Sequence, residues 1–257
     1  MGRKMVWLML FGLAGMMGFG RISSPTHAQP TLLTFAGYTW EVRSGFGGPG
    51  PNYWEPANVW VDEQGHLHLR LDYQAGQWRC AEVTMTNRLG FGRYQFWVEG
   101  ALNTLDPQVV LGLFDYPPSD VGPDGTNEID IEFARWGHAA NPPGNYTVWP
   151  AQVGLTQRTY AFDFTLAGTY TTQRFTRQSQ SVRFQSLHGH RDDNANQFAG
   201  WLFRPRDPLR RIPQAPLPVH LNLWLFQGQP PQNGQSVEIV IHAFTFTPAL
   251  TDTLRRR

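Results

Sequence analysis

Three acidic side chains alternate with apolar ones in one short stretch of the chain. The order Glu128-Ile129-Asp130-Ile131-Glu132-Phe133 has the period of two that is typical of a half-buried β-strand. Successive side chains of a strand point to opposite faces, so Glu128, Asp130 and Glu132 are predicted to share one face. We call these three residues the carboxylate row; the apolar residues between them are predicted to enter a core.

The spacing of the carboxylate row suits the hydrolysis of glycosidic bonds. The two glutamates are roughly 13 Å apart at Cα, and side chains that lean inward leave about 5 Å between their carboxyl groups. A retaining glycosidase needs this separation, because one carboxylate attacks the anomeric carbon while a protonated partner releases the leaving oxygen. No Lys or Arg interrupts the row, so repulsion is expected to raise at least one pKa. The alternative is a solvated acidic face on a one-sided sheet.

The first 28 of the 257 residues are predicted to be a secretory signal peptide. Arg3 and Lys4 precede an apolar run over residues 5–19, and Thr26-His27-Ala28 forms a small-residue cleavage site. The mature protein is therefore expected to be secreted or periplasmic; the alternative is that the apolar run stays uncleaved as an anchor. No later apolar run is long enough to span a bilayer, so no membrane association is expected after cleavage. Residues 29–250 are predicted to form one domain, and residues 251–257 a basic tail.

Scarce residue types exclude several other activities. Lys4 is the only lysine, so the mature chain has none for a phosphate-binding loop or a Schiff base. Cys80 is the only cysteine, which excludes an intramolecular disulfide and favours a small buried residue over a nucleophile. The formal net charge of +1 predicts no basic face for nucleic acid.

Short strands and turns are predicted for the whole mature chain. No stretch of ten or more residues has a helical period, and 26 Gly and 20 Pro interrupt the sequence. This pattern is typical of an all-β sandwich or jelly roll. Besides the acidic stretch, strands are predicted over residues 39–43, 59–62, 66–72, 81–86, 92–98, 108–114, 159–164, 181–186, 220–226 and 237–246.

Three other motifs are interpreted as structural elements. Residues 45–52 are rich in Gly and Pro and are expected to form a loop that joins no sheet and overhangs a cleft. His66 and His68 share one face of their strand, where a polar surface is favoured over a metal site because no third ligand is placed. Residues 192–196 lack the Gly and the closing Glu of a calcium loop, so a turn is predicted.

Aromatic side chains near polar ones are candidates for stacking on sugar rings. Trp136 follows Glu132 by four residues and shares its face if the strand continues. In residues 220–226 three leucines form one face, which leaves Asn222 and Trp224 on the other. An amide beside an aromatic plane suits a sugar site, although large aromatic residues more often fill cores.

The acidic stretch resembles the catalytic strand of glycoside hydrolase family 16, the retaining β-glucanases that include lichenases, laminarinases and xyloglucan endotransglycosylases. Gly90-Phe91-Gly92-Arg93-Tyr94 is similar to the strand start upstream of it in that family, and Tyr160-Ala161-Phe162-Asp163-Phe164 to the downstream strand. Asn222-Leu223-Trp224 is similar to a cleft motif of lichenases. The resemblance extends from Trp40 to Pro248.

The resemblance implies a concanavalin-like β-jelly roll of two antiparallel sheets, with the carboxylate row on the concave face of an open cleft. It also implies that Glu128 is the nucleophile, that Asp130 tunes the pair of glutamates, and that Glu132 is the acid/base residue. The residues expected to bind substrate are Glu82, Phe114, Trp136, Asn222 and Trp224.

Departures from the family pattern concern substrate choice. Thr84 stands where lichenases have an Arg, and Thr126 stands where a Trp is usually found two residues before the nucleophile. Of the two cysteines that form a pair in lichenases, this chain has only Cys80. The absence of an extra residue between Asp130 and Glu132 resembles the lichenase and endotransglycosylase branches. The resemblance implies no catalytic cofactor or metal; a structural calcium ion fits the family, but no motif here requires one.

These observations predict a monomeric, secreted, retaining endo-glycoside hydrolase that acts on a β-linked glucan-type polysaccharide. One alternative is a transglycosylase with the same residues, in which a sugar hydroxyl replaces water. Another is a non-catalytic carbohydrate-binding module on the same scaffold. A Pro-rich segment with four arginines is interpreted as a solvated loop, which is favoured over a border of the cleft that contacts anionic or heavily hydroxylated sugars. These arginines are Arg204, Arg206, Arg210 and Arg211.

Overall fold

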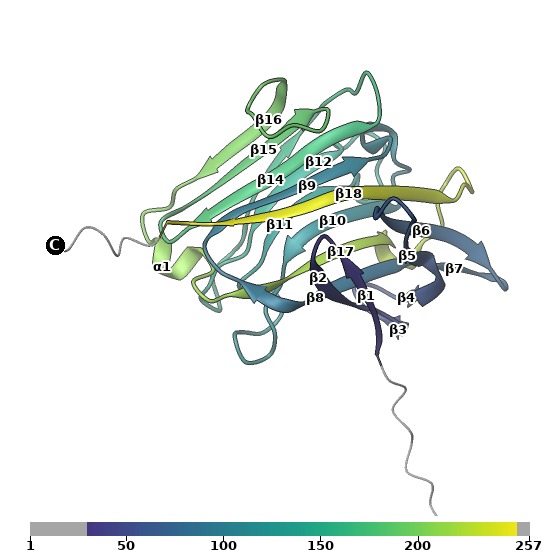
Figure 1. The fold of residues 1–257 in the computed structure, drawn as a ribbon, viewed down its shortest axis with the longest axis horizontal. Coiled ribbons are helices and arrows are strands. Elements are labelled where there is room, and N and C mark those ends of the chain that lie inside the picture. Colours follow the sequence, from purple (N-terminus) through teal and green to yellow (C-terminus); the bar gives the residue numbers. More distant parts are fainter. Residues whose placement is uncertain (1–29, 251–257) are drawn as a thin grey trace, which may run out of the picture.

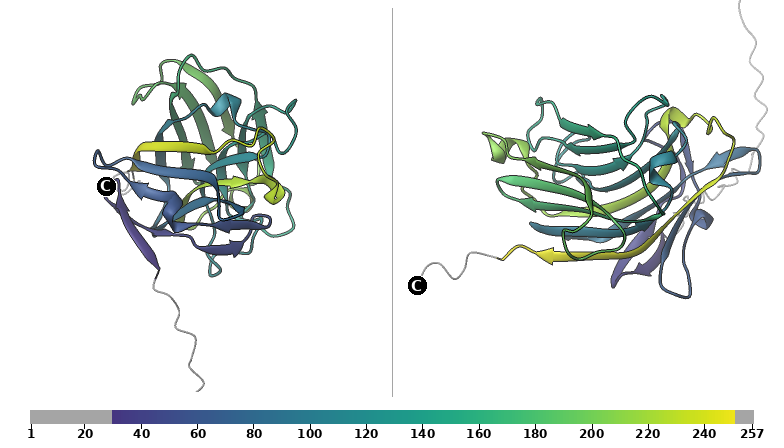
Figure 2. Two further views of the ribbon diagram at one scale, coloured as in Figure 1. Left: turned by 90° about the vertical axis from the view of Figure 1, so that its right-hand side faces the viewer. Right: turned by 90° about the horizontal axis from the view of Figure 1, so that it is seen from above.

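The computed structural model describes residues 30–250, in which two large antiparallel β-sheets lie face to face (Figures 1 and 2). The first sheet has the strand order β1-β2-β8-β17-β10-β11-β12-β13. Its strands are β1 (Thr31–Phe35), β2 (Tyr38–Val42), β8 (Ala81–Leu89), β17 (Leu217–Leu225), β10 (Val109–Asp115), β11 (Ile129–Phe133), β12 (Gly144–Val148) and β13 (Arg158–Phe162).

The second sheet has the order β16-β15-β14-β9-β18-β6-β5, and β7 pairs with β6. Its strands are β16 (Gln197–Phe203), β15 (Ser181–His188), β14 (Tyr170–Gln178), β9 (Gly92–Glu99), β18 (Val237–Pro248), β6 (Leu67–Gln74), β5 (Val59–Val61) and β7 (Gln77–Arg79). Since strands distant in sequence are neighbours in both sheets, the sequence prediction of a β-jelly-roll sandwich is confirmed.

Short elements complete the described chain. The strands β3 (Gly45–Gly47) and β4 (Asn52–Trp54) form a separate hairpin. The helical turns are η1 (Pro56–Asn58), η2 (Leu102–Thr104), α1 (Pro208–Arg211) and η3 (Phe226–Gly228). None of the helices in residues 30–250 has the length and apolar character needed to cross a membrane.

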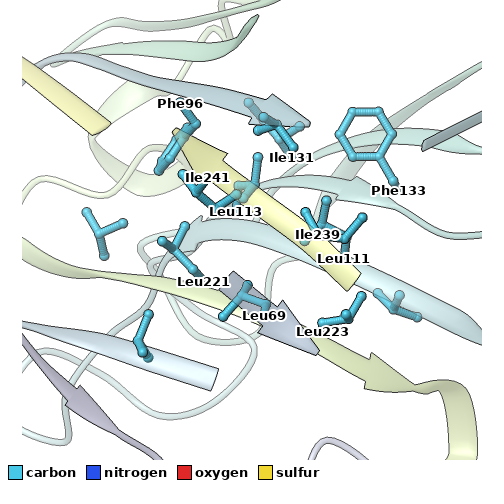
Figure 3. Close-up of a cluster of buried hydrophobic side chains, with 14 of the residues drawn as sticks. Leu69, Phe96, Leu111, Leu113, Ile131, Phe133, Leu221, Leu223, Ile239 and Ile241 are labelled. Atoms are coloured by element: carbon cyan, nitrogen blue, oxygen red, sulfur yellow. The ribbon is translucent and has the colours of Figure 1, made fainter. Parts of the chain in front are cut away.

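The core lies between the two sheets, where apolar side chains from both inner faces meet (Figure 3). The first sheet contributes Leu111, Leu113, Ile131, Phe133, Leu221 and Leu223, and the second Leu69, Phe96, Ile239 and Ile241. These side chains alternate along their strands with residues of the outer faces, as the period of two predicts. Burial of each large apolar side chain contributes about 1.5–3 kcal/mol.

Every strand that the sequence predicts is present, but β12 and β14 among others escaped prediction. All five residues of β12 are buried, and Asn145 and Thr147 among them are polar. In β14 the buried residues include Thr172, Gln173 and Arg174. Both strands thus lack the alternation of apolar and polar residues by which a half-buried strand is recognised.

The expectation that residues 45–52 join no strand pairing is wrong for both ends of that segment. Gly45–Gly47 pairs with Asn52–Trp54, and the turn between them is short enough for a hairpin. The predicted signal peptide and the basic tail lie outside the described residues. The turn predicted at residues 192–196 is present between β15 and β16.

Candidate active site

The carboxylate row lies in a cleft of about 680 Å³ on the outer face of the first sheet. Side chains of β8, β17, β10 and β11 form the floor, and the turn at Gly48 and Pro49 lies at the border. The expectation that residues 45–52 reach over a cleft is confirmed to that extent. Glu128, Asp130 and Glu132 all line this cleft, as the alternation along the strand predicts.

Regular pairing of β11 holds the row in register. Its partner β10 places Phe114 opposite Asp130 and Gly112 opposite Glu132, without a shift. The predicted absence of an extra residue between Asp130 and Glu132 is thereby confirmed. Glu128 lies one residue before the strand begins at Ile129.

Burial raises the pKa of every member of the row. It raises the pKa of Glu128 to about 8 and that of Glu132 to about 7, and it holds the pKa of Asp130 well above its ordinary range. A side-chain hydrogen bond between Asp130 and Glu128 lowers the pKa of Glu128 and raises that of Asp130. The sequence predicts at least one raised pKa in the row, and the structure extends the rise to all three residues.

Trp149 contacts two members of the row, and no pattern in the sequence predicted this role. Its indole Nε1 donates to Oδ2 of Asp130 at 2.9 Å. Its backbone N–H donates to the carbonyl oxygen of Glu128 at 2.8 Å. Asp130 thus accepts from Trp149 with one oxygen, and its other oxygen is available to donate a proton to Glu128.

Four of the five predicted substrate-binding residues line the cleft, namely Glu82, Phe114, Asn222 and Trp224. Trp136 does not, because β11 ends at Phe133 and Trp136 itself has a φ of 51°. Its ring packs behind that of Trp224, at 6.5 Å between ring centroids. Trp224 is only 7 % exposed, so it is part of the core as well as of the cleft wall.

Gly112 creates the space that Asn222 occupies. The two residues are paired across β10 and β17, and a Cβ on Gly112 lies 2.4 Å from Oδ1 of Asn222. Asn222 is 3 % exposed, and its Oδ1 has no hydrogen-bond partner within residues 30–250. A buried acceptor without a partner on a cleft floor suits a sugar hydroxyl, which can donate to it.

Glu82 is held by two side chains that the sequence did not associate with it. Nη1 of Arg43 lies 2.7 Å from Oε2 of Glu82, and Nδ1 of His220 lies 3.2 Å from Oε1. Although burial opposes ionisation, the hydrogen bonds and charges of His220 and Arg43 lower the pKa of Glu82. The Arg that the sequence lacks at Thr84 thus has a counterpart in Arg43, which follows β2.

His220 completes this side of the cleft. Its ring stacks on Phe114 at 5.1 Å between centroids, and its Nδ1 lies 3.0 Å from Oγ1 of Thr84. Tyr116, which packs edge-on against His220, donates its hydroxyl to Asp124 at 2.6 Å. Both Tyr116 and Asp124 line the cleft beside Glu128.

The structure also places the motifs outside the row. Cys80 is buried, as predicted. Imidazoles of His66 and His68 lie 3.3 and 3.2 Å from the same carboxylate oxygen of Asp62, on the polar strand face that was favoured. Within residues 30–250 no group of three or more His, Cys, Asp or Glu side chains is arranged to hold a metal ion.

None of the four arginines of the Pro-rich segment is among the described residues that line the cleft. Arg211 pairs with Asp207 of the same segment at 3.0 Å, and Arg210 Nε donates to Gln152. Arg204 lines a different cavity, beside Phe91 and Phe246. These positions agree with the favoured interpretation of a solvated loop.

Comparison with known proteins reveals a related β-glucanase and many similar folds. No family model matches the chain. A β-glucanase of Paenibacillus macerans is 37% identical over 108 residues, which are 40% of this chain and 43% of that protein. The match thus spans less than half the length of the relative.

Solved structures extend the similarity of fold to most of the chain. The Bacillus licheniformis β-glucanase has a TM-score of 0.60 and 20% identity, over 87% of this chain and 95% of that chain. A second similar structure is that of a Bacteroides ovatus mixed-linkage-glucan protein of glycoside hydrolase family 16 in complex with a G4G4G3G product. It has a TM-score of 0.62 and 12% identity, over 81% of this chain and 94% of that chain.

At these identities the solved structures establish the fold, and the Paenibacillus protein adds a similarity of sequence to a β-glucanase. Two of the motifs on which the sequence resemblance rests meet in the cleft, which is lined by Glu128, Asp130 and Glu132 of one and by Asn222 and Trp224 of the other. Sequence and fold together therefore confirm the resemblance of this chain to glycoside hydrolase family 16.

Proposed function

We propose that the protein is a secreted endo-glycoside hydrolase that cleaves a β-linked glucan with retention of anomeric configuration. The observation that carries this proposal is the row of three carboxyl groups with raised pKa values on the floor of an open cleft. The β-glucanase relative and the fold support a glucan as substrate. The N-terminal sequence supports export.

The roles of the row are those that the family resemblance implies. The hydrogen bond with Asp130 lowers the pKa of Glu128 and so acts against burial, in the direction of the ionised form that a nucleophile needs. Burial raises the pKa of Glu132 to about 7. As the protonated acid, Glu132 transfers its proton to the leaving oxygen. In the second step Glu132 takes a proton from water, which attacks the glycosyl ester and frees Glu128.

The neighbours of the row orient the sugar. Asn222 Oδ1 accepts from a hydroxyl, and the rings of Phe114 and Trp224 face the same cleft. Glu82 is ionised by its contacts with Arg43 and His220, so it accepts further sugar hydroxyls on the β8 side.

The test is the release of reducing ends from mixed-linkage β-1,3-1,4-glucan, β-1,3-glucan and xyloglucan. The wild type is expected to shorten at least one of them into oligosaccharides, and Glu128→Gln, which matches the size of Glu128, is expected to release none. Products longer than the starting chains would identify a transglycosylase. Tight binding of a glucan without cleavage would identify a binding module and refute the proposed activity.

A further inference from the structure

A fully buried ion pair connects β10, the neighbour of the catalytic strand β11, with the opposite sheet. Asp115 ends β10 of the first sheet, and Arg177 lies on β14 of the second. Nη1 of Arg177 lies 3.3 Å from Oδ2 of Asp115, and both side chains are 0 % exposed. The guanidinium also donates to the carbonyl of Leu89 at 2.7 Å and to the hydroxyl of Tyr94 at 3.1 Å.

Stability alone is a poor reason for such a pair. Removing two charges from water costs several kcal/mol per ion, and replacing a buried pair by apolar residues is often neutral or stabilising. Here the geometry is also incomplete, because Nε and Nη1 of Arg177 and Oδ2 of Asp115 have no hydrogen-bond partner among the described residues. The attraction between Arg177 and Asp115 is therefore one of charge, at 3.3 Å and without a hydrogen bond. Oδ1 of Asp115, which is not the oxygen that faces Arg177, makes a second contact with the backbone beside Glu128.

Oδ1 of Asp115 accepts from the backbone N–H of Ile129 at 2.9 Å. That N–H belongs to the peptide unit that follows Glu128, and the carbonyl of the same unit accepts from Trp149 N at 2.8 Å. Both polar groups of the peptide are therefore fixed. The residue before Glu128, Asn127, has a φ of 52°, and its N–H donates to Pro150 O at 2.9 Å.

We infer that Asp115 is a positioning residue for Glu128, held in place by Arg177. Its carboxylate fixes the peptide from which the Glu128 side chain projects, at the point where β11 has not yet begun. Strand pairing positions Asp130 and Glu132 through opposite residues of β10, whereas Glu128 lies outside the β11 strand. The orientation of the nucleophile therefore depends on a contact from the core side. This inference rests on the proposed role of Glu128.

Two double variants separate positioning from packing. Asp115→Asn/Arg177→Met keeps an acceptor for the Ile129 N–H, and Asp115→Leu/Arg177→Met removes it. Both double variants remove the charges of Asp115 and Arg177. Any electrostatic effect of these charges on the carboxylate row is therefore the same in the two variants and cancels when the variants are compared with each other. If Asp115→Leu/Arg177→Met does not fold, Asp115→Ala/Arg177→Met replaces it.

The first readout is hydrogen exchange of the Ile129 amide in the folded protein, which needs no substrate. We expect exchange at least tenfold faster in the variant without the acceptor than in the variant with Asn. The second readout is kinetics on mixed-linkage β-1,3-1,4-glucan. We expect kcat to be at least tenfold lower in the variant without the acceptor, with KM unchanged, because the ground-state binding residues are not affected.

The possible failures are distinguishable. Equal Ile129 exchange and equal kcat in two folded variants would overturn the inference while the proposed function stands. A wild type that cleaves no glucan would overturn the proposed function, and the exchange comparison would still decide whether Asp115 holds the peptide. If neither variant without the acceptor folds and the Asn variant does, Asp115 is required for folding and the inference is wrong.

Discussion

Replacing Gly112 by Ala is expected to damage the cleft through Asn222. Gly112 lies between Asn222 on β17 and Glu132 on β11. An added Cβ lies 2.4 Å from Oδ1 of Asn222, whereas ordinary contact begins at 3.4 Å. The amide oxygen must therefore move by about 1 Å, the difference between these two distances. Ring carbons of Phe114, at 3.3 Å, restrict the space on another side.

A displacement of about 1 Å in a group that positions substrate lowers kcat/KM by about 100-fold, or about 2.7 kcal/mol of transition-state stabilisation. Overpacking by one methyl group lowers the free energy of unfolding by about 1–3 kcal/mol. Gly168→Ala is the matched control, because no atom lies within 4 Å of a Cβ at that position. Gly168→Ala is expected to leave both kcat/KM and the free energy of unfolding unchanged.

The assay is kcat/KM on mixed-linkage β-1,3-1,4-glucan for Gly112→Ala, Asn222→Ala and the double variant. If Gly112→Ala acts through Asn222, the double variant is no less active than Asn222→Ala alone, since the displaced group is absent. Two losses that multiply would refute the reasoning. A loss of less than about threefold for Gly112→Ala would refute it as well.

Azide should give a β-glycosyl azide with Glu132→Ala, by intercepting the Glu128 ester of an activated aryl glycoside, and an α-glycosyl azide with Glu128→Ala. Proton NMR reads the configuration, and swapped products would reverse the two roles. Trp149→Phe removes a hydrogen bond to Asp130 that contributes about 1 kcal/mol, so kcat/KM should fall about fivefold; unchanged kinetics would show that the contact is not used. Because the pKa values of Glu128 and Glu132 are raised from 4.5 to about 8 and about 7 in the folded state, the folded protein binds protons that the unfolded chain has lost. This contribution to stability is complete below about pH 4.5 and disappears as the pH rises to about 8, so the Tm of the wild type should fall more between these values than that of Glu128→Gln/Glu132→Gln. Parallel Tm curves would contradict the raised pKa values.

Local periodicity explains which parts of the site could be predicted. The alternation in β11 is visible within six residues, and it places Glu128, Asp130 and Glu132 on one face whatever the neighbouring strands are. The same argument applies to β17, where buried leucines fix the side from which Asn222 and Trp224 project. It fails for Trp136, because the strand ends before that residue.

The sequence by itself therefore determined the all-β class, the carboxylate row and most of the cleft residues, since each depends on spacing along one strand or on one motif. Only the tertiary structure decided which side chains meet the row. Arg43 reaches Glu82, Trp149 reaches Asp130, and Asp115 reaches the peptide after Glu128. These contacts depend on strand order, pairing register and the packing of two sheets, which join segments far apart in the chain. A periodic pattern within one segment records which face is buried, but not which partner lies opposite.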